Sequence, residues 1–259
     1  MPDILEIAKT AARRAGEAIK ASRNGKVEQK ASNNLLSEAD LRAQQAIADT
    51  VLEAFPDHAV LGEEGNIGAL DEAKHIWVVD PLDGTNNFVH GIPIYSCSVA
   101  YAFEGEVRAG VVLDPERDEM FWAHSGGGAF LNGASIVPSE ARALEDVITS
   151  FGFYYDRGEV MRYTLGTVQR LLEANIRGIR RTGSAALDCC WVGCGRLQEF
   201  FEYRLSPWDF SAGAFIAREA GARVTSASGG ALGLEPASVV LTAPGVYDAF
   251  FEIVKREGA

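Results

Sequence analysis

The chain has 259 residues, of which 47% are hydrophobic and 23% are charged, an ordinary balance for a soluble globular protein. That length is enough to bury a large core in one big domain or in two closely packed lobes. The formal net charge is −12, from 24 basic and 36 acidic residues. This charge argues against broad binding to nucleic acid or to an anionic membrane, because both require a basic face.

Neither membrane insertion nor a zinc site is expected. No segment approaches the roughly 20 apolar residues that span a bilayer, and the N-terminus has no apolar signal-peptide core. The four cysteines, at positions 97, 189, 190 and 194, form no Cys-x-x-Cys pair. We interpret them as small buried residues in a reducing environment, so a cytoplasmic location is expected.

Hydrophobic periodicity predicts two amphipathic helices at the start of the chain, followed by strands. Asp3 and Ser37 are suitable N-caps for the two helices, and Pro56 ends the second. Turn residues such as Glu104-Gly105 separate the later apolar runs. The expected elements are helices over 4–19 and 38–55, a loop or mobile hairpin over 22–36, and strands at 59–61, 76–79 and within 97–130.

The second half repeats this mixture of helices and strands. Helices are expected over 159–172, 185–194, 210–219 and 246–254, with strands around 200–201 and 239–241. Strand pairs and helices alternate irregularly along the chain. A layered α+β fold therefore fits better than a regular α/β alternation.

One segment carries more chemical information than any other. The apolar run 76–79 ends in Asp80 and Asp83, and Gly84 and Thr85 follow at once. Apolar runs of this kind are usually buried strands. Burying two carboxylates close together is costly unless they are paired or bound to a metal. A hard divalent cation is the simplest way to hold them side by side.

Several acidic positions share this context, at the end of an apolar element beside Gly, Pro or Trp. They are Asp40, the pair Glu63-Glu64, the pair Asp80 and Asp83, and Asp209 after Pro207-Trp208. If Glu63, Asp80, Asp83 and Asp209 converge, they supply an oxygen-only cage that suits Mg²⁺ better than zinc. Such a cage can hold two cations about 4 Å apart, the usual arrangement for phosphate ester hydrolysis.

The residues after Asp83 add an anion pocket to this hypothesis. If a helix begins here, the free N–H groups of Gly84 and Thr85 point outward beside the carboxylates. Gly84 would let a phosphate approach the backbone closely. The Thr85 hydroxyl could orient a water molecule.

With these residues in order, the sequence resembles the inositol monophosphatase family of Mg²⁺-dependent, lithium-sensitive phosphatases over nearly its whole length. The first motif is 77–88 (WVVDPLDGTNNF), and the second is 208–213 (WDFSAG). Supporting matches are 62–64 (GEE), 128–133 (GAFLNG) and 183–186 (GSAA). Both main motifs in order, with Gly-Glu-Glu upstream, form a very specific pattern.

The resemblance implies a role for each matching residue. The ligands of two or three Mg²⁺ ions would be Glu63, Asp80, the Leu82 carbonyl, Asp83 and Asp209. Glu63 and Thr85 would orient the attacking water, with Asp40 behind them. The substrate would contact Gly84, Thr85, Ser184, Ala185, Glu202, Asp209 and, near the metal-bound water, the loop residue Lys30.

The resemblance also implies a fold, an assembly and a reaction. The fold would be a layered α-β-α-β-α sandwich of the inositol monophosphatase and fructose-1,6-bisphosphatase type. An N-terminal lobe, 1–145, would carry most metal ligands. A C-terminal lobe, 146–259, would carry Asp209 and the substrate pocket. The expected enzyme is a homodimeric phosphoric monoester hydrolase that releases phosphate from a small polyol phosphate, with inositol 1-phosphate favoured.

Other interpretations remain open. Histidinol phosphate is the second candidate substrate, because Asp188 could meet its ammonium group. Fructose 1,6-bisphosphate and 3′-phosphoadenosine 5′-phosphate follow. A protein of another class, a non-catalytic interaction protein on the same fold, would have lost metal ligands. Asp80 and Asp83 alone would also suit a turn and an N-cap, and Glu202 would also suit the surface.

Overall fold

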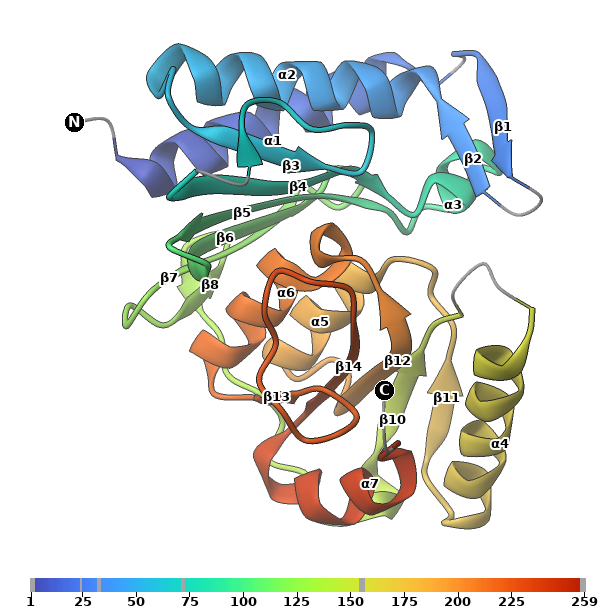
Figure 1. Cartoon of the computed structure of the whole chain (residues 1–259). Coiled ribbons are helices and arrows are strands. Elements are labelled where there is room, and N and C mark those ends of the chain that lie inside the picture. The colour runs from blue at the N-terminus through green and yellow to red at the C-terminus, as the bar shows by residue number, and fades with distance from the viewer. Residues whose placement is uncertain (1–2, 24, 32–33, 71–72, 154–156, 257–259) are drawn as a thin grey trace.

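The fold has five layers, in the order helix, sheet, helix, sheet, helix (Figure 1). The computed structural model describes residues 3–23, 25–31, 34–70, 73–153 and 157–256. The outer helices are α1 (Ile4–Ala21) and α2 (Glu38–Ala54) on one side, and α4 (Glu159–Glu173) and α7 (Tyr247–Val254) on the other. Between the two sheets lie α5 (Ala185–Gly193) and α6 (Pro207–Ala220). The expected layered α+β sandwich is confirmed.

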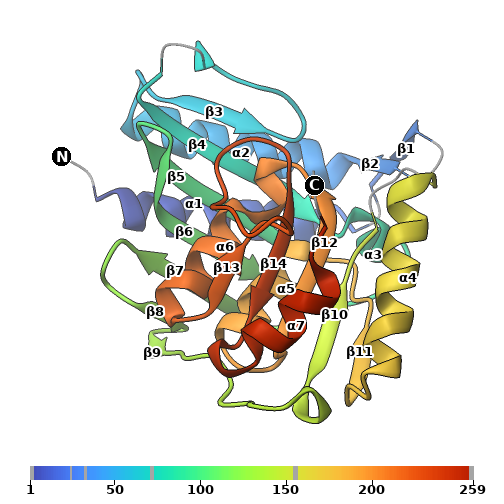
Figure 2. The ribbon, with the colours of Figure 1, turned by 60° about the horizontal axis from the view of Figure 1, so that its bottom comes forward.

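The larger sheet has seven strands that follow one another in chain order (Figure 2). The first two strands are parallel, and every later pair is antiparallel. The strands are β3 (Ala59–Gly62), β4 (His75–Asp83), β5 (Ser96–Phe103), β6 (Glu106–Asp114), β7 (Glu119–His124), β8 (Ala129–Leu131) and β9 (Ala134–Ser135).

The smaller sheet has five strands in the order β11-β10-β12-β14-β13. Its central strand β12 is parallel to β10 and antiparallel to β14. The strands are β10 (Ile148–Phe151), β11 (Gly178–Arg180), β12 (Glu199–Leu205), β13 (Arg223–Thr225) and β14 (Ala237–Thr242). Short 3-10 turns, η2 (Leu144–Asp146) and η3 (Pro244–Val246), flank the sheet. The division into lobes 1–145 and 146–259 stays a prediction.

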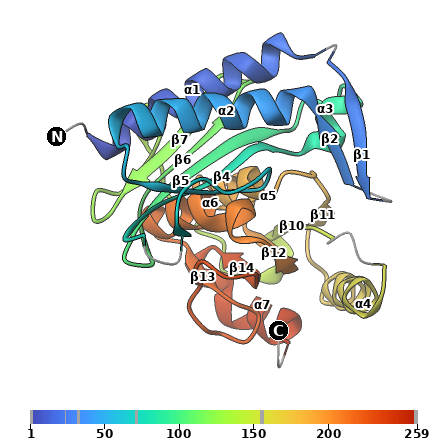
Figure 3. The ribbon, with the colours of Figure 1, turned by 45° about the horizontal axis from the view of Figure 1, so that its top comes forward.

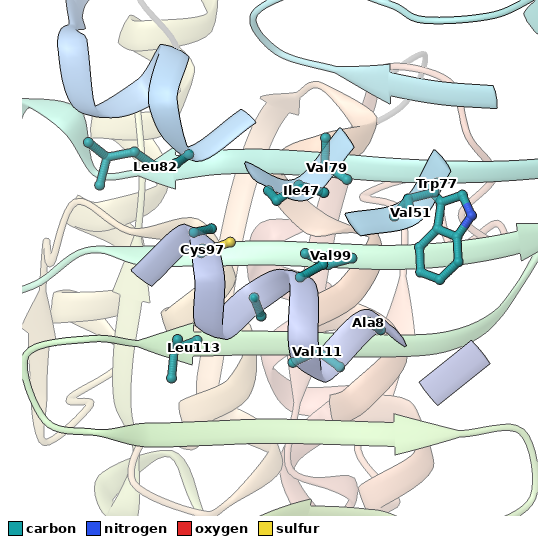
Figure 4. Close-up of a cluster of buried hydrophobic side chains, with 14 of the residues drawn as sticks. Ala8, Ile47, Val51, Trp77, Val79, Leu82, Cys97, Val99, Val111 and Leu113 are labelled. Atoms are coloured by element: carbon teal, nitrogen blue, oxygen red, sulfur yellow. The ribbon is translucent and has the colours of Figure 1, made fainter. Parts of the chain in front are cut away.

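Four hydrophobic clusters fill the four spaces between the five layers. In the first cluster, Trp77 and Val79 of β4 face Ile47 and Val51 of α2 (Figure 4). Alanines on α1, among them Ala8 and three others along the same face, are fully buried and let that helix lie close to the sheet. Both faces of the seven-stranded sheet are therefore covered.

A small hairpin lies beside the short helix α3 (Thr85–Val89) at one end of the larger sheet (Figure 3). It pairs β1 (Val27–Ala31) with β2 (Asn34–Ser37) in antiparallel fashion. This confirms a hairpin within residues 22–36. No helix in the described ranges combines the length and apolarity needed to cross a membrane.

The long elements agree with the sequence predictions, and the differences lie in short ones. α6 begins at Pro207, three residues before the expected start, because Ser206 caps it and proline is favourable in a first turn. The helix that was considered after Gly84 is present as α3. The separate strands β10, β11 and β13 were not predicted. Each has only three or four residues, too few for a hydrophobic period to stand out.

Candidate active site

A β-bulge turns Asp80 and Asp83 to the same side of β4. Residues three apart on a regular strand face opposite sides. Here Asp80 pairs with Ser98 and Asp83 with Ser96, so one residue is extra on β4, which contains Pro81 at this point. Since Ser96 and Ser98 share a face of β5, both aspartates point toward α5 and α6. Both carboxylates are buried.

Asp209 reaches the same place from the first turn of α6. The Ser206 N–H donates to Asp209 Oδ2 at 2.7 Å, in a capping box that ties the side chain to the start of the helix. The Ser98 hydroxyl donates to the Trp208 carbonyl at 3.4 Å, which joins this turn to β5. Asp209 therefore lies within a helix, where sequence reasoning expected only the approach to one.

Asp40 occupies the matching position in α2, in a second Ser-x-x-Asp capping box. Asp40 Oδ2 accepts from the Ser37 N–H at 2.8 Å and from the Ser37 hydroxyl at 2.6 Å. Its other oxygen, Oδ1, accepts from the Thr85 hydroxyl at 2.9 Å. The same hydroxyl lies 3.0 Å from the Leu82 carbonyl. Asp40 thus lies behind Thr85.

The carboxylate of Asp83 is bound to the N-terminus of α5. Its Oδ2 accepts from the Ser184 hydroxyl at 2.5 Å and from the Ala186 N–H at 2.8 Å, and its Oδ1 accepts from the Ala185 N–H at 3.2 Å. These contacts satisfy otherwise free amides of the helix and bring a negative charge to its positive end. Ser184 and Ala185 therefore lie beside Asp83.

A pocket of about 760 Å³ contains most of the predicted site. Residues of β4 and of the turn after it line one part of the pocket. Residues of α5, β12 and α6 line another part. The predicted residues that line it are Glu63, Asp80, Leu82, Asp83, Gly84, Thr85, Ser184, Ala185, Glu202 and Asp209. Asp40 is buried and is not among the residues that line the pocket. The side chain of Lys30, on β1, lies outside the described residues.

The pocket also has lining residues that the sequence analysis did not identify. They include Gly152 and Phe151 at the end of β10, together with Arg157. A Cβ on Gly152 would overlap the carboxylate of Glu202, so the glycine gives that side chain its space. Gly152 directly follows 147–151 (VITSF), a segment rich in β-branched and aromatic residues, and this was the signal in the sequence that could have identified the position.

Burial and mutual repulsion raise the pKa of the site carboxyls. For Asp80 the largest cause is burial, and the negative charges of Glu63, Asp83 and Asp209 raise its pKa further. Burial and then Glu63 raise the pKa of Asp209. Burial also raises the pKa of Asp83, against the lowering effect of the Ser184 hydroxyl. A group of carboxylates in this state favours either protons or a cation.

Two further carboxyl groups, those of Asp188 and Glu202, line the same pocket. Burial raises the pKa of Asp188 to about 7, although the hydroxyls of Thr182 and Ser150 donate to its Oδ2 at 2.7 and 2.8 Å. Burial raises the pKa of Glu202 as well, with further contributions from Asp209. Arg181 has the opposite, lowering effect on both groups.

The donor set suits a hard cation by its chemistry. All the side chains involved are carboxylates, and the peptide carbonyl of Leu82 is also an oxygen donor, the ligand type that Mg²⁺ prefers. Across the described ranges, no three His, Cys, Asp or Glu side chains already converge around one point as a finished cage. The oxygens of Asp83 and one oxygen of Asp209 are instead directed to backbone and hydroxyl donors.

Comparisons with known proteins agree with the fold. The chain matches the sequence profile of the inositol monophosphatase family over residues 1–257. It is 37% identical over 254 residues to the inositol-1-monophosphatase of Rhizobium meliloti, which covers 98% of this chain and 93% of that protein. It is 38% identical over 247 residues to the Nus factor SuhB of Pseudomonas aeruginosa, covering 93% and 91%.

A solved structure extends this similarity to three dimensions. The extragenic suppressor protein SuhB of Bartonella henselae superimposes with a TM-score of 0.89, at 32% identity and over 99% of both chains. Fold and sequence therefore agree, and the chain belongs to the inositol monophosphatase family. Its relatives carry both enzyme names and the name Nus factor.

Proposed function

We propose that this protein is a Mg²⁺-dependent phosphomonoesterase that acts on a small polyol phosphate, with inositol 1-phosphate as the favoured substrate. The observation that carries the proposal is the bulge in β4, which directs the buried carboxylates of Asp80 and Asp83 into the same pocket as Asp209. Gly84 and Thr85, at the start of α3, line that pocket too. Carboxylates beside an anion-accepting turn suit a metal-assisted attack on phosphate.

The residues that would hold two or three Mg²⁺ ions are Glu63, Asp80, Asp83, Asp209 and the carbonyl of Leu82. When bound, Mg²⁺ supplies charge neutralisation of the phosphate and a more acidic water. This assignment is supported by the donor chemistry and by the raised pKa values of the aspartates. A bound cation would reduce the repulsion between their negative charges.

Groups of the chain itself would align the attacking water, bind the phosphate and return a proton to the leaving oxygen. The Thr85 hydroxyl, with its proton directed to Asp40, would accept a hydrogen bond from the attacking water. Glu63 would hold the same water from the other side. The amides of Gly84 and Thr85 would bind the phosphate oxygens. A water held by Asp209 would return a proton to the leaving oxygen, so no covalent phosphoenzyme is required.

The favoured substrate follows from the far end of the pocket. Glu202 has the chemistry to accept hydrogen bonds from ring hydroxyls, and Ser184 and Ala185 line the same space. Histidinol phosphate is second, because Asp188 adds a carboxyl that suits an ammonium group. Fructose 1,6-bisphosphate and 3′-phosphoadenosine 5′-phosphate are less suited, since Arg157 and Arg181 are the pocket's only arginines among its described lining residues.

The test is phosphate release from these four esters, with Mg²⁺, with EDTA, and with Li⁺ added to Mg²⁺. We expect Mg²⁺-dependent turnover that is highest on inositol 1-phosphate and that Li⁺ inhibits. Mg²⁺-dependent turnover that favours another ester would correct the substrate alone. An absence of turnover on all four esters would favour the alternative of a non-catalytic interaction protein, which the name of the Nus factor relative keeps under consideration.

The assembly and the location remain parts of the proposal. We expect a homodimer, as the family resemblance implies, in the cytoplasm. Light scattering of the purified protein measures the first directly, and a stable monomer would contradict it.

A further inference from the structure

The side-chain amide of Gln44 on α2 binds the loop that carries Glu63 through two hydrogen bonds. Gln44 Oε1 accepts from the Glu64 N–H at 3.1 Å, and Gln44 Nε2 donates to the Gly65 carbonyl at 3.0 Å. The side chain is nearly fully buried. Both functions of one amide are therefore used on the two residues that directly follow Glu63.

Gly62 makes this contact possible. A Cβ at position 62 would lie 2.6 Å from Gln44 Oε1 and 3.0 Å from Gln44 Cδ, closer than real side chains pack. The amide of Gln44 thus lies against the bare Cα of Gly62. The glycine before Glu63 and the glutamine on α2 form one matched pair.

The loop is fixed from the opposite side by the sheet. The Glu63 N–H donates to the Val79 carbonyl at 3.3 Å, next to Asp80, and the Gly65 N–H donates to the Gly62 carbonyl at 3.3 Å. Glu63 therefore lies between a backbone hydrogen bond to β4 and the two Gln44 hydrogen bonds that attach residues 64 and 65 to α2.

Gln44 also lies one helical turn after Asp40, on the same buried face of α2. Asp40 holds the Thr85 hydroxyl, and Gln44 holds the Glu63 loop. One face of α2 is therefore bonded both to Thr85 and to the loop that carries Glu63, the two residues proposed to hold the attacking water.

We propose that Gln44 is a positioning residue that pre-organises Glu63 for cation binding and water alignment. This inference rests on the proposed function. An amide suits the position because it donates and accepts at once and has no charge. An ionised carboxylate there could not donate to the Gly65 carbonyl, and it would add a negative charge close to an already repulsive cluster.

The test compares Gln44→Met with the matched control Gln45→Met. Methionine keeps similar bulk and removes both hydrogen bonds. Gln45 is the exposed neighbour on the same helix, and its amide bonds only Asp49 at 2.7 Å among the described contacts. Calorimetric titration of the metal-free proteins with Mg²⁺ should show about 10- to 100-fold weaker binding for Gln44→Met, the usual effect of losing an outer support, and no change for the control.

Two further readouts separate positioning from general damage. Hydrogen exchange of the metal-free protein should speed up in residues 62–65 of Gln44→Met while α2 itself stays protected. At saturating Mg²⁺ the variant should keep its KM for substrate and lose kcat. Mg²⁺ affinity equal to that of the wild type would overturn the proposal, as would exchange that speeds up evenly over the chain.

A double-mutant cycle tests the pairing of Gln44 with Gly62. Gly62→Ala should weaken Mg²⁺ binding strongly in the wild-type background, because its methyl group displaces the Gln44 amide. In the Gln44→Ala background the same change should have a smaller effect, since only the contact of the methyl group with the Gly65 carbonyl, at 3.0 Å, then remains. Equal effects in both backgrounds would contradict the pairing. A wild type that binds no Mg²⁺ would instead contradict the proposed function itself, and the role of Gln44 with it.

Discussion

The Thr85 hydroxyl lies 2.9 Å from Oδ1 of Asp40 and 3.0 Å from the carbonyl oxygen of Leu82. A hydroxyl has one proton, so it donates to one of these acceptors at a time. Donation to Asp40 leaves the Leu82 carbonyl available to a cation and the Thr85 lone pairs available to a water. A charged acceptor also makes the stronger hydrogen bond. In the proposed mechanism, Asp40 would therefore act on the chemistry through Thr85.

Removing the Thr85 hydroxyl tests this relationship. Thr85→Ala should lower kcat by about 10²- to 10⁴-fold, the range for losing a group that positions a reacting proton. KM should change little, because the phosphate contacts proposed for this turn would come from backbone amides. Thr85→Ser, which keeps the hydroxyl, should retain most of the activity. Steady-state kinetics of both variants at saturating Mg²⁺ provide the measurement, and equal losses in the two would contradict a role for the hydroxyl.

Asp80→Asn should separate stability from activity. The asparagine Oδ1 can still accept from the Leu82 N–H, which Asp80 does now at 3.0 Å, while the negative charge is removed from a crowded group of carboxylates. The metal-free variant should therefore unfold at a higher temperature than the metal-free wild type. Turnover should fall more than about 100-fold, because a proposed metal ligand is lost. Calorimetric melting in EDTA is the measurement, and a lower melting temperature would be inconsistent with the repulsion inferred here.

The stability of the metal-free protein should fall as the pH rises. Burial and neighbouring carboxylates raise the pKa of Asp80 and Asp209 above their ordinary value of 3.8, so the folded chain binds protons more readily than the unfolded chain. This contribution to stability is fully present below the unfolded pKa and is lost as the pH rises through the raised values. Mg²⁺ should remove most of the slope, since it takes the place of protons.

Urea unfolding between about pH 5 and 8, in EDTA and in Mg²⁺, measures this dependence. The Asp80→Asn variant in EDTA should also show a shallower slope than the wild type. Identical slopes with and without Mg²⁺ would mean that the carboxylates of this site are not responsible.

Gly152→Ala should disturb the substrate end of the pocket and leave the carboxylates near β4 in place. The added methyl group overlaps the Glu202 carboxylate, so Glu202 must move away from its present position. KM for the best substrate should rise about 10-fold or more, in the range of one lost polar contact. Mg²⁺ affinity should stay near that of the wild type. Gly166→Ala on α4 is the control, because its methyl group meets only Arg170, at an ordinary 3.6 Å.

Glu199→Met should stabilise the protein. Glu199 is fully buried on β12, and neither of its carboxyl oxygens has a hydrogen-bond partner in the part of the chain that the structure describes. Replacing an unsatisfied buried polar group by an apolar one of similar length should add about 1–3 kcal/mol to the free energy of unfolding. Glu199→Gln keeps the unsatisfied atoms and should not give this gain. Chemical denaturation of both variants at one pH decides between them.

The local pattern of the sequence was enough to predict most long elements and the residue types of the site. Regular apolar spacing identified helices such as α1, where Asp3 is the N-cap as expected. Ser37 was expected to cap α2, and it does so together with Asp40. Helix periodicity and N-caps depend on neighbours within a few residues, so the local sequence is enough to predict them. The candidate metal ligands were recognisable for a related reason, since acidic groups directly after apolar runs are unusual and motif-specific.

Tertiary structure decided how those residues meet. The bulge that turns Asp80 and Asp83 to one side depends on pairing with β5, and pairing partners lie outside any local pattern. Asp83 caps α5 across a separation of about a hundred residues, and Gln44 reaches the Glu63 loop from another element. Gly152 matters only because Glu202 comes to lie against it. Sequence by itself determined which groups are available for chemistry. Long-range packing determined which oxygens are held, which remain available and where a substrate can bind, because those properties depend on distances between segments that the local pattern does not contain.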